Sequence, residues 1–196
     1  QVERLARALR SEPLSDRAET GNAAGDQVPR LQPVARGLTE RLWYGAGSQR
    51  SADWAGRSGW NLLTGNVITA ETSEDFLQTQ ADLIATYNRA AGDAGRVALG
   101  RVILPTDSAD AATRTRYADF AAVRLARTRQ PNGPRRTMFL PDIVGTTDEI
   151  LNALHRDPVF AQVREFRLEL PYEFSAADYR QIITDFTRLF PALRGR

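Results

Sequence analysis

A turn rich in glycine and serine stands where an apolar run gives way to a helical pattern. The run at residues 42–44 ends at the sequence GAGS, residues 45–48, and an arginine and another serine follow in the first turn of the expected helix. Glycine lets backbone N–H groups approach an anion closely, and the N-terminal end of a helix favours negative charge. Serine hydroxyls and an arginine guanidinium donate hydrogen bonds to phosphate oxygens. The candidate phosphate-binding residues are Ala46, Gly47, Ser48, Arg50 and Ser51.

The same residue types also suit a tight strand-to-helix turn that binds nothing, so the residues alone leave both interpretations open. Other candidate residues give weaker evidence of function. His155 is expected at the exposed end of a helix. Glu169, Tyr172 and Glu173 follow an expected strand, but they form no acid and base pair with a defined spacing. The catalytic residues therefore stay unassigned.

The composition excludes several kinds of chemistry. The 196 residues contain no cysteine and one histidine, which excludes thiolate nucleophiles, disulfides and metal sites built on cysteine or several histidines. All 26 basic residues are arginine, so a lysine Schiff base and a phosphate loop that needs lysine are excluded as well. These arginines are scattered among 24 acidic residues rather than clustered, which argues against nucleic-acid binding.

The chain lacks an apolar run of about 18 residues and an N-terminal leader pattern, so we expect neither a membrane span nor secretion. These features predict a cytoplasmic protein. The chain begins at Gln1, inside an amphipathic helical pattern, so we also expect an upstream part to be missing.

Strand and helix patterns alternate along most of the chain. Strands are predicted at 41–45, 60–64, 97–104 and 165–170, and helices at 2–10, 50–58, 73–91, 109–129, 147–156 and 175–189. The helix starts at Ser73, Thr147 and Ser175 are each followed by acidic residues, as is usual for N-caps. Residues 11–37 are expected to form a long loop and residues 130–146 an irregular excursion. Such alternation predicts an α/β fold with a parallel sheet.

Three motifs together resemble a known family. They are LWYGAGSQRSADWAGRSGWNLLTGN (42–66), VGTTDEI (144–150) and DFTRLFPALR (185–194), and they occur in the family's order over residues 38–194. They resemble the C-terminal half of the bacterial luciferase-like flavin-dependent monooxygenases. The resemblance implies a (β/α)₈ TIM barrel, of which this chain, as a single domain over 1–196, would hold about the last four βα units.

The resemblance also implies a function. In that family the turn at 45–48 contacts the phosphate of FMN, and the end of the next strand, here Thr64 and Gly65, lies near the flavin ring. Reduced FMN and O₂ would oxygenate a small organic substrate, and a separate NAD(P)H:flavin reductase would supply the reduced flavin. A homodimer is expected. Two alternatives stay open: an F420-dependent oxidoreductase of the same fold, and a non-catalytic flavin-binding protein or inactive barrel fragment.

Overall fold

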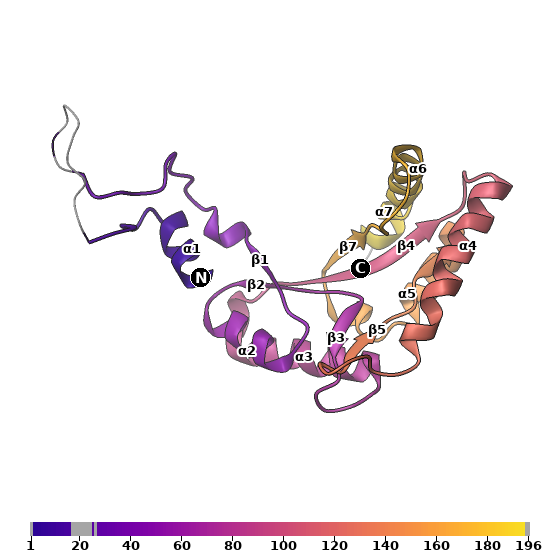
Figure 1. Cartoon of the computed structure of the whole chain (residues 1–196), viewed down its shortest axis with the longest axis horizontal. Helices are drawn as coiled ribbons and strands as arrows, with labels where there is room; N and C mark the ends of the chain where they lie inside the picture. The colour runs from indigo at the N-terminus through magenta and orange to yellow at the C-terminus, as the bar shows by residue number, and fades with distance from the viewer. Residues whose placement is uncertain (1, 17–24, 26, 195–196) are drawn as a thin grey trace. The chain divides into compact units, whose positions relative to one another are not determined.

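The computed structural model describes residues 2–16, 25 and 27–194, and it divides into two compact units, Gln1–Trp43 and Tyr44–Arg196 (Figure 1). The first unit contains the helix α1 (Val2–Leu9) and the 3₁₀ turn η1 (Thr39–Arg41). The stretch predicted as a loop at 11–37 lies in this unit, and its residues 17–24 and 26 fall outside the described residues. The expectation of a single domain over 1–196 stays a prediction.

The second unit is built on a five-stranded sheet whose central strand is β4 (Val97–Pro105). The first residues of β4 pair in parallel with β2 (Asn61–Thr64) and its middle with β7 (Glu165–Glu169). Its last residues pair in parallel with β6 (Ile143–Gly145). In the described part of the chain, β1 (Trp43–Gly45) neighbours only β2, and β7 neighbours only β4, so the sheet is open. The fold is therefore α/β with a parallel sheet, and closure into a barrel stays a proposal.

The predicted helices are present, most with shifted starts. They are α2 (Gln49–Arg57), α3 (Phe76–Ala91), α4 (Ala111–Leu125), α5 (Thr147–His155) and α6 (Ala176–Thr187), followed by α7 (Phe190–Arg194) and joined by the 3₁₀ turns η2 (Gly92–Ala94), η3 (Ala126–Thr128) and η4 (Phe160–Gln162). Helices α1 and α5 begin where predicted, whereas the starts of α2, α3, α4 and α6 are shifted by one to three residues. Ser175 caps α6 as predicted. Asp75 rather than Ser73 caps α3, and Thr146 rather than Thr147 caps α5, because the side-chain oxygen of each accepts a hydrogen bond from the backbone N–H three residues later.

The prediction of an irregular excursion at 130–146 was wrong. This stretch contains β5 (Thr137–Phe139), which pairs antiparallel with β3 (Val67–Thr69), and it also contains β6. The predicted set of four strands therefore omitted β3, β5 and β6. Each of these strands is three residues long, which is too short for a periodic pattern to stand out.

Close helix packing and a buried strand form the core. The helices α2 and α3 lie against one another (Figure 1), and a Cβ on Gly56 would lie 2.8 Å from the side chain of Ala90. Along β4, Val102 and Leu104 belong to a buried cluster with Tyr117 of α4 and Ile182 of α6. No helix in the described residues is long and apolar enough to cross a membrane.

A buried carboxylate ties α6 to the loop that follows β4. Asp185 is fully buried, and its carboxylate accepts hydrogen bonds from the backbone N–H of Ser108 at 2.8 Å and from the Ser108 hydroxyl at 2.9 Å. Burial raises the pKa of Asp185, but the hydrogen bonds from Ser108 and Gln181 outweigh burial, so the pKa of Asp185 lies below its ordinary 3.8. This contact contributes stability above pH 3.8 that is lost as the pH falls further.

We therefore expect Asp185→Asn to lower the free energy of unfolding by about 1–3 kcal/mol at pH 7, because it places an amide where three donors, two from Ser108 and one from Gln181, need a carboxylate. Urea unfolding at pH 7 and near pH 3 measures the effect. The difference between the two proteins should shrink at the lower pH, because Asp185 becomes protonated there. A difference that is the same at both pH values would contradict this account of Asp185.

Candidate functional site

The turn after β1 is fixed on both sides by backbone hydrogen bonds. The N–H of Ala46 donates to the carbonyl of Leu63 at 3.0 Å, which places the turn beside the end of β2. The carbonyl of Gly47 accepts from the N–H of Thr69 at 2.7 Å. A Cβ on Gly47 would lie 3.3 Å from the carbonyl oxygen of Val67, so a larger residue would crowd this contact. The structure thus brings the first two predicted site residues to the ends of neighbouring strands.

Ser48 and Ser51 form a capping box at the start of α2. The N–H of Ser51 donates to the Ser48 Oγ, and the N–H of Ser48 donates to the Ser51 Oγ, both at 3.2 Å. The two hydroxyl oxygens lie 2.8 Å apart. Both serines are half-buried, whereas Arg50 is exposed. Two hydroxyls are therefore gathered at the positive end of α2, where an anion is favoured.

A carboxylate already stands at this helix end. The N–H of Gln49, the first residue of α2, donates to the Glu71 Oε2 at 2.5 Å. Glu71 lies 22 residues away in the loop after β3, and its side chain is exposed. The negative charge expected at the helix N-terminus is thus supplied by the chain itself. Sequence reasoning missed Glu71, because nothing local links it to α2.

A second carboxyl group lies over two glycines of the sheet. A Cβ on Gly65 would lie 1.7 Å from the Glu169 Oε1, and a Cβ on Gly100 would lie 2.0 Å from the same atom. Glu169, the last residue of β7, therefore reaches across β4 to the end of β2 only because both positions lack a side chain. The backbone N–H of Asn66 also bonds to the Glu169 carboxylate.

Burial raises the pKa of Glu169, and the opposing effects of the Asn66 N–H and the Arg101 charge do not cancel it. The Glu169 carboxyl group therefore keeps its proton to a higher pH than a free glutamate does. A carboxyl with a raised pKa at the end of parallel strands is suited to proton transfer. In the described residues, no group of three or more His, Cys, Asp or Glu side chains could hold a metal ion.

Gln80 of α3 donates hydrogen bonds to both Thr64 and Gly65. The Gln80 Nε2 donates to the Thr64 Oγ1 at 3.0 Å and to the Gly65 carbonyl at 2.8 Å. Thr64 is buried, and its hydroxyl oxygen faces Gln80. The position of these two residues beside a flavin ring stays a prediction, and in the structure they lie at the end of β2 with Glu169 over Gly65.

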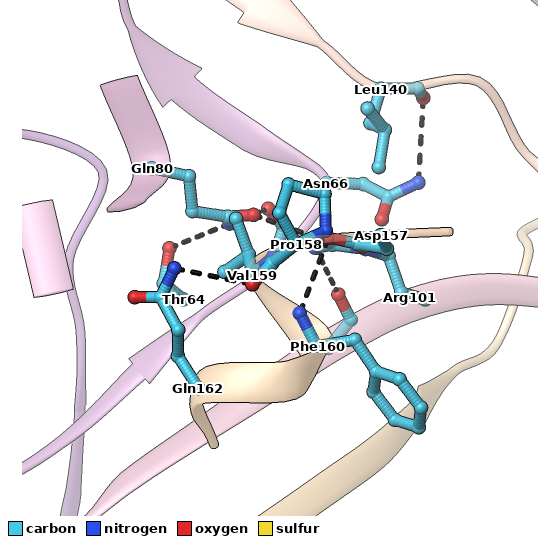
Figure 2. Close-up of polar contacts among 12 residues, drawn as sticks. Thr64, Asn66, Gln80, Arg101, Leu140, Asp157, Pro158, Val159, Phe160 and Gln162 are labelled. Carbon is cyan, nitrogen blue, oxygen red and sulfur yellow. Dashed lines mark hydrogen bonds and ion pairs between the residues drawn. The ribbon is translucent and has the colours of Figure 1, made fainter. Parts of the chain in front are cut away.

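A buried arginine connects Gln80 to the rest of the fold (Figure 2). Arg101 in the middle of β4 is fully buried, and its Nη2 donates to the Gln80 Oε1 at 2.8 Å. Its Nε and Nη2 donate to the Asp157 Oδ2 at 2.9 and 2.7 Å. Burial lowers the pKa of Arg101, and the charge of Asp157 opposes this shift. The other carboxylate oxygen of Asp157 accepts from the backbone N–H groups of Val159 and Phe160.

Comparison with known proteins gives structural likeness only. No family model matches the chain, and no curated protein sequence matches it. Among solved structures, monooxygenase RslO1 from Streptomyces bottropensis is similar with a TM-score of 0.55 and 17% identity, and apo-MsnO8 with a TM-score of 0.53 and 18% identity. Each match covers 97% of this chain but only 59% and 58% of the respective solved chain. The chain therefore shares its fold with part of these proteins.

Asp157→Asn tests the buried ion pair. The amide keeps an oxygen for Val159 and Phe160 but removes the charge that compensates Arg101. We expect the free energy of unfolding to fall by about 3–5 kcal/mol, because the variant leaves a buried charge without its partner. The exposed Asp93→Asn is the matched control, and it should change stability by about 0.5 kcal/mol or less. Urea unfolding measures both variants. If Asp157→Asn lowered the free energy of unfolding by no more than Asp93→Asn does, the role of the ion pair would be contradicted.

Gly65→Ala tests the contact with Glu169. The added methyl group meets the carboxyl group, so we expect a loss of about 1–3 kcal/mol in the free energy of unfolding. In a Glu169→Ala background the loss should shrink by at least about 0.5 kcal/mol. Denaturant unfolding of the four proteins of this cycle gives the coupling. Gly45→Ala, whose Cβ meets nothing within 4 Å, is the control, and equal losses in both backgrounds would disprove the contact.

Proposed function

We propose that the chain carries about four βα units of a (β/α)₈ barrel, and that its parent protein is a flavin-dependent monooxygenase of the luciferase-like group. The observation that most supports this proposal is the shared fold: 97% of this chain is similar in structure to part of monooxygenase RslO1. The three sequence motifs that resemble the luciferase-like family point the same way. The order of the polar groups along the sheet, with the serine-rich turn first and Glu169 last, suits a ligand lying across the strand ends.

The residues at the start of α2 are of types that bind phosphate, namely hydrogen-bond donors and an arginine. The Ser48 and Ser51 hydroxyls bond to one another, and the Ser51 hydroxyl also donates to the Ser48 carbonyl; both can turn to donate to phosphate oxygens. Arg50 is exposed on the first turn of the same helix and can reach an anion there. Glu71 is the one group that does not fit, because its charge repels a phosphate. Since Glu71 is exposed and held by one hydrogen bond to Gln49, its side chain can rotate away.

Bound reduced FMN would supply two electrons to O₂, so that one oxygen atom enters a small organic substrate and the other leaves as water. The residues of this chain would bind and orient the cofactor. The turn at 45–48 would fix its phosphate, and Gly65 would leave room for the Glu169 carboxyl group beside the ring. Glu169 would hold a proton beside the ring, at an oxygen that already lies over Gly65. The parent protein would receive reduced flavin from a separate NAD(P)H:flavin reductase and act as a homodimer.

The F420-dependent alternative uses the same fold for hydride transfer, and product formation that needs O₂ distinguishes it from the monooxygenase. A non-catalytic flavin-binding protein would bind FMN without turnover. RslO1, which is described as a monooxygenase, favours the oxygen-dependent reaction.

FMN binding to the full chain tests the phosphate site, with riboflavin as the ligand that lacks the phosphate. We expect Glu71→Gln to strengthen FMN binding by about fivefold, because a like charge near the phosphate is removed. Ser48→Ala should weaken FMN binding, and neither variant should change riboflavin binding. Quenching of flavin fluorescence measures the affinity of each ligand for the unchanged chain and for both variants.

Glu74→Gln is the matched control, because Glu74 is an exposed acid of the same loop that pairs with Arg136 instead of α2. It should leave FMN binding unchanged. Equal affinity for FMN and riboflavin, or the same gain from Glu74→Gln as from Glu71→Gln, would overturn the proposed phosphate site.

A further inference from the structure

A groove on the surface of the second unit shares no lining residue with the strand ends described above. It has a volume of about 570 Å³ and lies between α4, the loop after β7 and the start of α6. Its lining comprises Arg116, Asp119, Phe120, Val123, Arg124, Tyr172, Glu173, Phe174 and Asp178. The α4 members recur at intervals of three and four residues, so they form one stripe along that helix. A groove of this size is large enough for a small organic molecule.

Aromatic side chains form the wall of the groove. The ring of Phe174 packs against Phe120 and Tyr117 of α4, with centroids 5.0 and 5.1 Å apart, and these contacts fix the loop on the helix. Tyr172 and Val123 line the same groove and are 78% and 82% exposed. Large apolar and aromatic groups exposed together around a groove are unusual unless something covers them.

The backbone of the loop is held in an unfavourable conformation. Glu173, between the two aromatic residues of the loop, has a φ of 72°. Residues other than glycine rarely adopt this left-handed conformation, and it costs energy that the surrounding contacts must offset. Phe174 supplies such contacts on one side. The result is that Tyr172 and the Glu173 carboxylate are both presented at the groove.

The charges of the groove favour a cation. Both arginines of the lining are already paired, Arg116 with Asp178 and Arg124 with Asp142. The carboxylates of Asp119 and Glu173 have no hydrogen-bond or ion-pair partner among the described residues. An aromatic face with unpaired carboxylates beside it attracts an ammonium group through both the ring quadrupole and the negative charge.

We propose that this groove binds a small organic cation in which an ammonium group is attached to an apolar body. The apolar body would lie against Val123 and Phe174, because the Arg124 guanidinium already lies over the Phe120 ring at 4.6 Å. The ammonium group would lie between Tyr172 and the two free carboxylates. This site shares no residue with the proposed flavin site, so it stands or fails independently of that function.

Three phenyl compounds of similar size but different charge test the proposal: 2-phenylethylamine, 2-phenylethanol and 3-phenylpropionate. Titrations of the full chain, followed by backbone amide NMR, give both the affinity and the place of binding. We expect the amine to bind at least about fivefold more tightly than the alcohol, and the carboxylate to bind least. The shifted amides should belong to α4 and to residues 172–174.

Variants then separate the charge from the aromatic contact. Asp119→Asn with Glu173→Gln should remove the preference for the amine over the alcohol, whereas Tyr172→Ala should weaken both. Asp93→Asn with Asp148→Asn removes the same net charge from exposed positions outside the groove and should leave the preference intact. If the double variant does not fold, Glu173→Gln alone takes its place, and it should reduce the preference for the amine. Equal binding of the three probes, binding elsewhere, or no binding of the amine would overturn the proposal.

Discussion

The buried ion pair between Arg101 and Asp157 is the constraint on which the rest of the site depends. A charge taken out of water costs several kcal/mol, so a guanidinium in the middle of a fully buried strand is tolerated only where every donor has a partner. Here Asp157 takes two of the N–H groups and Gln80 another. Apolar contacts would allow the packed elements to slide, whereas these hydrogen bonds hold only at one geometry. Arg101 therefore fixes the positions of α3 and of the turn before η4 relative to β4.

The effect of this pair reaches the strand ends through Gln80. Its amide oxygen is taken by Arg101, which leaves the amide nitrogen to donate to Thr64 and Gly65. The end of β2 is thereby held in place on one side, while Glu169 rests over Gly65. Because Arg101 also attracts the Glu169 charge, the same guanidinium limits how far burial raises the pKa of Glu169. One buried arginine thus affects both the position and the proton affinity of this carboxyl group.

The parts of the fold with local signals could be predicted from the sequence. The apolar run of β4 and the Ser175 cap of α6 each rest on residues close in the chain. The strands β3 and β5 could not be predicted, because they are short and their pairing joins residues 70 positions apart. The contacts around the candidate site could be predicted only in part, for the same reason. Ser48 and Ser51 lie three residues apart, whereas Glu71 and Glu169 reach the site only through tertiary structure. Arg101 did leave a signal, since it is the one charged residue inside the run VALGRVILP.

The start of α2 shows why the GAGS turn is ambiguous in sequence. A tight turn and a phosphate site need the same groups, namely glycines for the close approach and serines for the free N–H groups of the helix. Ser48 and Ser51 bond to one another in a capping box, and the Glu71 carboxylate accepts the hydrogen bond from the Gln49 N–H. The proposed binding of a phosphate there would be an exchange in which one anion replaces another. The affinity would then depend on the difference between the two anions, and so on Glu71, which lies outside the motif itself.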